Sequence, residues 1–250
     1  MQLSNKISVM KQLKTNQSKK NQSNFVPKGV IVVDGGVGGA TLLHKLRLLP
    51  LHVVYLNVAN ATTSLDANNF VIHQVKQLQC LNHYVMLLPS FTPNVAKLKQ
   101  SVDVAQVVCA EPPLYQARQY STMQVAVISA TNRSYDGCQT INGSCLANLI
   151  NGGAPEREIR AQIESDFANV ICDTVAFDDC VFSTQRNNFW SVCPNVKFFD
   201  CADSLTSSFF KNKKLRQNND LQTQTIMFCD NTGKTEQIFN KILQKIYKSY

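Results

Sequence analysis

The sequence predicts an α/β fold built on parallel sheets that helices cover on both faces. Short runs rich in apolar and β-branched residues alternate with longer stretches whose apolar residues recur at helical spacing, and this order runs through most of the 250 residues. The short runs are apolar throughout rather than at every second residue, which is typical of strands buried on both faces. Apolar residues make up 44% of the chain, enough for a substantial core.

Each predicted element follows from its local composition. The run GVIVVD at 29–34 ends in an acid followed by glycines and predicts a first strand, whereas 40–49 has helical spacing and stops at Pro50. The polar stretch 211–224 predicts a surface loop, and 236–247 predicts an amphipathic closing helix. The further predicted strands are 52–56, 84–88, 104–109, 124–128, 169–172, 174–177, 197–200 and 225–229, and the further predicted helices are 70–81, 93–100, 113–120 and 156–167.

Most of the net charge of +8 lies in the first 28 residues, which hold six lysines and no acid. The rest of the chain carries only +2. A segment rich in Asn, Gln, Ser and Lys has too little apolar content to fold alone, so we expect a basic, disordered N-terminal arm over 1–28. A weak contact of this arm with an anionic surface or nucleic acid is the alternative, although Phe25 is its only aromatic residue.

The chain shows neither a membrane span nor a secretion signal. No run of 18 apolar residues exists, and residues 1–28 lack the apolar core of a signal peptide, so a soluble cytoplasmic protein is expected. The nine cysteines stand singly, with no C-x-x-C spacing, which predicts reduced and mostly buried thiols. All four histidines lie before residue 84 without ligand spacing, so no metal site is expected.

The segment DGGVGG at 34–39 is the most specific local signal. Four glycines between a strand and a helix permit a tight turn and a close approach of backbone to a ligand, although the spacing does not match the dinucleotide pattern G-x-G-x-x-G. An unoccupied structural turn is the alternative interpretation. Gly233, Lys234 and Thr235 resemble the end of a P-loop, but the glycine required five positions earlier is Phe228.

The same glycine segment carries a family resemblance. The stretch VDGGVGGATLLHKLRLLP at 33–50 resembles the opening of glutamate racemase, where a strand, DSGVGG and a helix ending before LP follow one another. Further similar stretches follow in the same order, so the resemblance covers roughly residues 29 to 247. These stretches are VVCAEP at 107–112, VAVISATNRSY at 125–135, 144–152, DTVAF at 173–177 and 228–243.

The resemblance implies two similar doubly wound α/β domains that face each other across a cleft. Residues 29–112 together with 210–250 would form the first domain, and 113–209 the second. The implied reaction is cofactor-independent interconversion of L- and D-glutamate, which supplies precursors of peptidoglycan. Two cysteines, one from each domain, remove and return the α-proton on opposite faces, because a thiol can be poised as acid or base near neutrality.

In the first domain the family's A-C-N-T-A segment is replaced by PSFTP at 89–93. Ser90 stands in place of the cysteine and Phe91 in place of the asparagine, while Thr92 is retained. A serine hydroxyl has too high a pKa to replace a thiolate without a strong activating base. Asp34 survives, but Gly35 replaces the family's serine. The resemblance gives this aspartate a role in proton handling, and retention for the turn alone is the other interpretation.

In the second domain the family's G-C-T-H-Y segment is replaced by DDCVF at 178–182. Without a gap, Asp179 takes the cysteine position and Val181 the histidine position, whereas a shift of one residue makes Cys180 the thiol. Asn151 stands near the position of an expected acid. The resemblance thus gives Asp34, Ser90, Asp179 and Cys180 as the catalytic positions.

By the same resemblance, the positions expected to hold substrate are Gly35, Phe91, Thr92 and Val181. Two functions follow from these substitutions. One is an isomerase or related enzyme on a small acidic, glutamate-like substrate, working without a cofactor and with Cys180 as its single thiol. The other is a catalytically inactive homologue that retains the fold for binding or assembly, and the loss of both thiol positions favours it. A homodimer is a further expectation.

Overall fold

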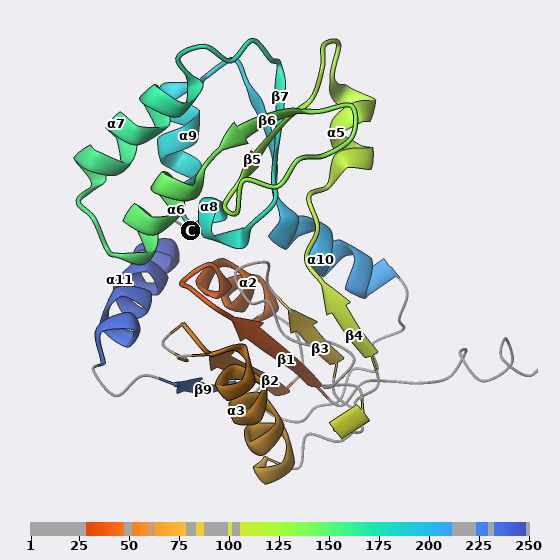
Figure 1. Ribbon diagram of the computed structural model, residues 1–250, viewed down its shortest axis with the longest axis vertical. Coiled ribbons are helices and arrows are strands. Elements are labelled where there is room, and N and C mark those ends of the chain that lie inside the picture. Colours follow the sequence, from red (N-terminus) through yellow and green to blue (C-terminus); the bar gives the residue numbers. More distant parts are fainter. Residues whose placement is uncertain are drawn as a thin grey trace, which may run out of the picture.

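A computed structural model of the chain describes residues 29–47, 52–59, 61, 63–78, 84–87, 100–101, 106–211, 224–229 and 233–248. Within these residues the protein is α/β, as predicted, and consists of two lobes stacked one above the other (Figure 1). Each lobe contains one parallel sheet flanked by helices. No helix in the described part of the chain is long and apolar enough to cross a membrane.

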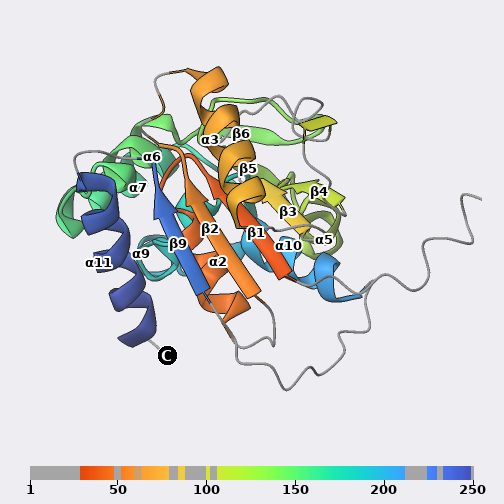
Figure 2. The same ribbon diagram turned by 90° about the horizontal axis from the view of Figure 1, so that it is seen from below.

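The first lobe contains a five-stranded parallel sheet in the order β4-β3-β1-β2-β9. Successive side chains of its central strand, β1, point alternately into two apolar clusters on opposite faces of the sheet. Val30 and Val32 pack in the cluster that reaches the second lobe, whereas Ile31 and Val33 pack with α3 on the opposite face (Figures 1 and 2). The elements of this lobe are β1 (Gly29–Asp34), α2 (Gly39–Leu46), β2 (His52–Asn57), α3 (Ser64–Gln77), β3 (Tyr84–Leu87), β4 (Gln106–Cys109), β9 (Gln224–Phe228) and α11 (Lys234–Lys248).

The second lobe contains a four-stranded parallel sheet in the order β6-β5-β7-β8. Phe177 on β7 anchors an aromatic core, with ring centroids 4.9 Å from Phe189 and 5.6 Å from Phe198. The elements are α5 (Leu114–Tyr120), β5 (Ala126–Ser129), β6 (Gln139–Asn142), α6 (Ser144–Asn151), α7 (Glu156–Phe167), β7 (Thr174–Phe177), α8 (Cys180–Ser183), α9 (Arg186–Val192), β8 (Lys197–Phe199) and α10 (Cys201–Lys211).

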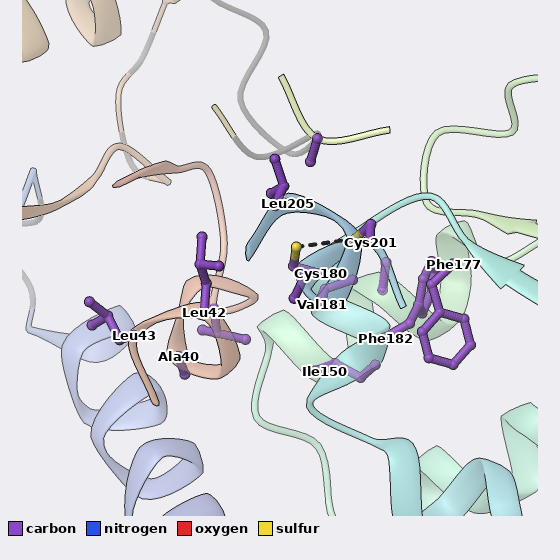
Figure 3. Packing of buried hydrophobic residues seen from close by; sticks show 14 of the residues in the cluster. Ala40, Leu42, Leu43, Ile150, Phe177, Cys180, Val181, Phe182, Cys201 and Leu205 are labelled. Atoms are coloured by element: carbon purple, nitrogen blue, oxygen red, sulfur yellow. Dashed lines mark hydrogen bonds between the residues drawn. The ribbon is translucent and has the colours of Figure 1, made fainter. Parts of the chain in front are cut away.

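One apolar cluster joins the two lobes. Leu42, Leu43 and Leu46 of α2 belong to the same buried cluster as Val181 and Phe182 of the second lobe (Figure 3). Helix α2 lies between the first sheet and the second lobe and contacts α8, α10 and α11. The carboxyl ends of β1 and β7, where parallel sheets place their ligand sites, therefore meet at this boundary.

The structure corrects several predicted elements and leaves others open. Residues 169–172 form a loop instead of a strand, and Ile171 there is 76% exposed, because the run 174–177 occupies the sheet position. The predicted helix 93–100 lies almost entirely outside the described residues, as do the arm 1–28 and most of the predicted loop 211–224. The domain boundaries near 112 and 210 stay a prediction.

Candidate functional site

Asp34 ends β1 at the centre of the first sheet and closes the glycine turn, which we define as residues 34–39. Its Oδ1 accepts a hydrogen bond from the Gly36 N–H at 2.9 Å, and its Oδ2 accepts from the Gly39 N–H at 2.7 Å and from the Tyr55 hydroxyl at 2.8 Å. Asp34 is fully buried. The carboxylate is thus held by three donors of its own lobe, an arrangement that stabilises the turn.

Strand β2 supplies two polar side chains that support this turn. Tyr55 hydrogen-bonds Asp34, and Asn57 donates from Nδ2 to the Tyr55 hydroxyl at 2.9 Å and to the Gly36 carbonyl. Burial, followed by the charge of Asp34, raises the pKa of Tyr55 well above its ordinary value, so the hydroxyl stays protonated and donates. No sequence motif marks these two residues, although both lie towards the carboxyl end of a strand beside β1.

The glycines of the turn make room for the second lobe. A Cβ on Gly38 would lie 2.6 Å from the backbone nitrogen of Val181 and 2.7 Å from the carbonyl carbon of Cys180. A Cβ on Gly36 would lie 2.5 Å from Oδ1 of Asn151, the same oxygen that accepts a hydrogen bond from the Val37 N–H at 3.0 Å. The close approach that glycine permits is therefore made to the protein itself at these two positions.

Helix α8 brings the second set of predicted residues to the turn. Asp179 precedes the helix and its Oδ1 accepts from the Val181 N–H at 2.8 Å, so it acts as the N-cap. Cys180 begins the helix and its sulfur lies 3.1 Å from the sulfur of Cys201. Asp179, Cys180 and Val181 are each exposed by 1% or less.

The environment of Cys180 disfavours a thiolate. The hydrogen bond with Cys201 lowers the pKa of Cys180, but burial and the charges of Asp200, Asp179 and Asp34 outweigh it and raise the pKa to about 11. A thiol in this state is a packed core group rather than a ready base.

The structure brings together Asp34, Asp179, Cys180 and Val181 at the contact between the lobes, and Gly35 follows Asp34 in the glycine turn. The other predicted positions, at 90, 91 and 92, lie outside the described residues. The roles predicted for all of these residues stay predictions.

A pocket of about 280 Å³ lies at the opposite end of α8 from the glycine turn, between α2, α9 and α11. We call it the side pocket. Among the described residues there is no group of three or more His, Cys, Asp or Glu side chains that could hold a metal ion, in this pocket or elsewhere. The residues that line it are Thr41, His44, Lys45, Ser183, Thr184, Gln185, Arg186, Asn187, Asn188, Trp190, Asp200, Ile242, Lys245 and Ile246.

Asp200 is the buried acid of the side pocket. Its Oδ1 accepts from the Ser183 hydroxyl at 2.5 Å and from the Ala202 N–H at 2.7 Å, whereas its Oδ2 is buried and has no hydrogen-bond partner in the described part of the chain. Burial first, and then the charge of Asp203, raise the pKa of Asp200 above its ordinary value. A buried carboxylate oxygen without a partner is costly, which makes Oδ2 a candidate ligand contact.

Two cationic side chains, Lys45 and Arg186, line the side pocket together with Asp200. Lys45 and Arg186 share one partner, Asp203, which leaves an excess of one positive charge in this cluster. Nε of Arg186 is buried and, within the described residues, has no hydrogen-bond partner, and its guanidinium lies 4.8 Å from the centroid of the exposed Trp190 ring. The side pocket thus offers a carboxyl group, a positive charge and an aromatic face within one small volume.

Comparison with known proteins supports the fold. No family model matches the chain, and no curated protein is significantly similar to it in sequence. Among solved structures, it is similar to glutamate racemase isoform RacE1 from Bacillus anthracis, with 14% identity, a TM-score of 0.64, and coverage of 87% of this chain and 94% of that one.

Two further solved structures are similar to the same extent. Glutamate racemase from Francisella tularensis in complex with D-glutamate has 13% identity and a TM-score of 0.58, covering 87% of this chain and 94% of that one. Glutamate racemase from Campylobacter jejuni has 12% identity and a TM-score of 0.67, covering 86% of this chain and 98% of that one. Likeness at this level of identity establishes a racemase-like fold.

Proposed function

We propose that this chain is a racemase-fold protein that binds a small zwitterionic molecule of amino-acid size in the side pocket and does not racemise it. The observation that carries the proposal is the state of Cys180, which is 0% exposed and hydrogen-bonded to Cys201 at the position where the resemblance expects catalysis. Within the described residues, two buried polar atoms of the side pocket, Oδ2 of Asp200 and Nε of Arg186, have no hydrogen-bond partner.

Racemisation needs an acid and a base on opposite faces of one α-carbon. Because the pKa of Cys180 is raised to about 11, its thiol stays protonated near neutral pH. Asp34 is occupied by the Gly36 and Gly39 amides and the Tyr55 hydroxyl, so moving a proton with it would dismantle the turn. Serine at position 90 in place of the other thiol removes the second base.

The chemistry of the side pocket favours a zwitterion. A ligand carboxylate would meet the positive charge of Lys45 and Arg186, and a ligand ammonium would meet Oδ2 of Asp200. The volume of about 280 Å³ lies just below the usual range of drug-sized ligand sites, which suits an amino acid rather than a dinucleotide.

Binding is tested by titration calorimetry with L-glutamate, L-glutamine and succinate, the last of which has carboxylates but no ammonium. We expect heat from at least one amino acid and at least tenfold weaker binding in both Asp200→Asn and Arg186→Gln. Arg157→Gln serves as the matched control, because Arg157 is an exposed residue of α7 that does not line the pocket. Binding of succinate equal to that of L-glutamate, or full affinity in Asp200→Asn, would contradict the proposal.

A second candidate is proton exchange at the α-carbon of glutamate with Cys180 as the single thiol. The contact of the glycine turn with α8 favours it, because Asp34, Asp179 and Cys180 meet there. Incubation with L-glutamate in heavy water, followed by proton NMR, separates the two candidates. We expect no exchange, and none restored by the double variant Ser90→Cys with Asp179→Cys. Exchange in the wild type that Cys180→Ala abolishes would establish the enzyme instead.

A further inference from the structure

Two cysteines meet in the second lobe because two neighbouring strands continue in the same way. Strand β7 pairs with β8 in parallel, and each leads into an aspartate and then a cysteine that begins a helix. Asp179 and Asp200 each accept a hydrogen bond from the backbone N–H two residues on. The two cysteines, Cys180 and Cys201, are thereby placed side by side with their sulfurs 3.1 Å apart (Figure 3).

We propose that Cys180 and Cys201 are a modification site, at which hydrogen peroxide joins the two sulfurs in a disulfide when the glycine turn moves away from α8. The present separation exceeds the length of a disulfide bond by about 1 Å, a distance that side-chain rotation can close. The site does not depend on the ligand proposed for the side pocket.

The contact between the lobes controls access to the sulfurs. Both cysteines are 0% exposed, and the backbone of Gly38 lies against Cys180 so closely that a Cβ there would be 3.1 Å from the cysteine Cβ. Leu42 of α2 and Leu205 of α10 belong to the same buried cluster (Figure 3). Peroxide therefore reaches the pair only after the glycine turn and α8 separate, so the rate of oxidation reports that opening.

The chemistry balances with peroxide as the only co-reactant. Cys180 loses its proton and its thiolate attacks one peroxide oxygen, so that the O–O bond breaks. The departing hydroxide takes up the proton that Cys180 lost, and a sulfenic acid and one water result. The sulfur of Cys201 then attacks the sulfenic sulfur, the S–O bond breaks, and the departing oxygen leaves as a second water with the Cys201 proton. Two thiols and one peroxide thus give one disulfide and two waters, and a dithiol reductant reverses the modification.

Cys180 is the thiol that the opening uncovers first, because Gly38 of the glycine turn packs against its Cβ. Burial and the neighbouring aspartates raise the pKa of both Cys180 and Cys201 in the closed state. The thiolate is the reactive form, so contact with water in the opened state is what permits the attack.

The test uses the full-length reduced protein. It is exposed to hydrogen peroxide, blocked with iodoacetamide, digested and analysed by mass spectrometry. We expect a linked peptide containing Cys180 and Cys201 that is two hydrogens lighter than the sum of its parts, absent in Cys201→Ser and unchanged in the control Cys145→Ser, since Cys145 is exposed. A linked peptide that forms in urea but never in the folded protein would overturn the proposal.

Gly38→Ala tests whether the contact between the lobes controls the access of peroxide to the two sulfurs. The methyl group of this variant forces the turn away from α8. We expect the linked peptide to form at least tenfold faster in this variant, with the fold checked by circular dichroism. Should the variant fail to fold, wild type in urea below its unfolding transition supplies the same comparison. The proposed control by the glycine turn would be overturned if Cys180 and Cys201 in the wild type were oxidised as fast as the exposed Cys145. It would also be overturned if neither Gly38→Ala nor urea accelerated the oxidation of the pair.

Discussion

The glycine turn and the side pocket lie at opposite ends of α8, and each contains a buried aspartate. Both oxygens of Asp34 in the turn accept hydrogen bonds, from the Gly36 and Gly39 N–H groups and from the Tyr55 hydroxyl. Asp200 in the side pocket receives two, both on Oδ1, and within the described residues its Oδ2 receives none. The comparison teaches that the aspartate at the end of β1 serves to hold the turn, whereas the aspartate of the side pocket keeps one oxygen available for a further hydrogen bond.

The largest effect is expected from Gly39→Ala. The new Cβ would lie 2.2 Å from the Tyr55 ring and 2.9 Å from Oδ2 of Asp34, so the turn must deform. We expect a loss of about 3 kcal/mol in the free energy of unfolding, measured by urea denaturation. Gly152→Ala is the matched control, since its nearest neighbour would be its own helix carbonyl at 3.1 Å. Equal loss in both variants would show that the turn is no tighter than an ordinary helix end.

The next effect is expected from Asp34→Asn. The Gly36 and Gly39 N–H groups and the Tyr55 hydroxyl now donate to the carboxylate. In the variant, the NH₂ of the asparagine side chain would face some of these donors and could not accept from them. We expect a destabilisation of about 2 to 3 kcal/mol, because a charged acceptor is lost and donors are left unmet. The same denaturation experiment measures it. Wild-type stability in this variant would contradict a structural role for Asp34.

A smaller effect is expected from Tyr55→Phe. This substitution removes the hydroxyl that donates to Asp34 and accepts from Asn57 but keeps the ring, which stacks on Phe239 with centroids 4.7 Å apart. We expect a loss of about 1 to 2 kcal/mol in unfolding free energy. Tyr115→Phe is the control, as Tyr115 is 73% exposed. A loss no greater than in the control would weaken the distinction between the two regions.

The smallest effect is expected from Asp200→Asn, and it depends on pH. Because the folded pKa of Asp200 is raised, the folded state binds its proton more tightly than the unfolded state does. That contribution to stability is complete below the ordinary aspartate pKa and is lost as pH rises through the raised folded pKa.

The variant lacks this ionisation, so it should gain stability relative to wild type as the pH rises from 4 to 7. Urea denaturation at the two pH values measures the difference. A relative stability that falls with pH would mean that the carboxylate of Asp200 is satisfied in its ionised form, as that of Asp34 is by its donors.

Much of the fold follows from local patterns. The helix 156–167 and the strand 174–177 have the predicted bounds, because their apolar spacing and flanking residues are unambiguous. Strand β6 at 139–142 is not predicted, since Ile141 is its only large apolar residue. Helices α8 and α9 are not predicted either, because pieces of four and seven residues are too short to show a period.

The residues of the candidate site likewise differ in whether the local sequence reveals them. Asp34 is visible in the sequence because a glycine motif follows it, and positions 179 and 180 are visible only through the order of the family resemblance. Tyr55 and Asp200 are not, because each acquires its importance from a partner far away in the chain: Tyr55 from Asp34, and Asp200 from a pocket that also includes Ile242. The first contact arises only when β1 and β2 pair in the sheet, and the second only when α11 packs beside the end of β8.

The leucines of α2 have a consequence for cooperativity. Since Leu42, Leu43 and Leu46 share one apolar cluster with Phe182, neither lobe can unfold without exposing the core of the other. Calorimetric melting is thus expected to be a single transition in spite of the two sheets. A fragment cut at the lobe boundary would expose the apolar face that α8 and α10 now bury against α2, so we expect it to aggregate.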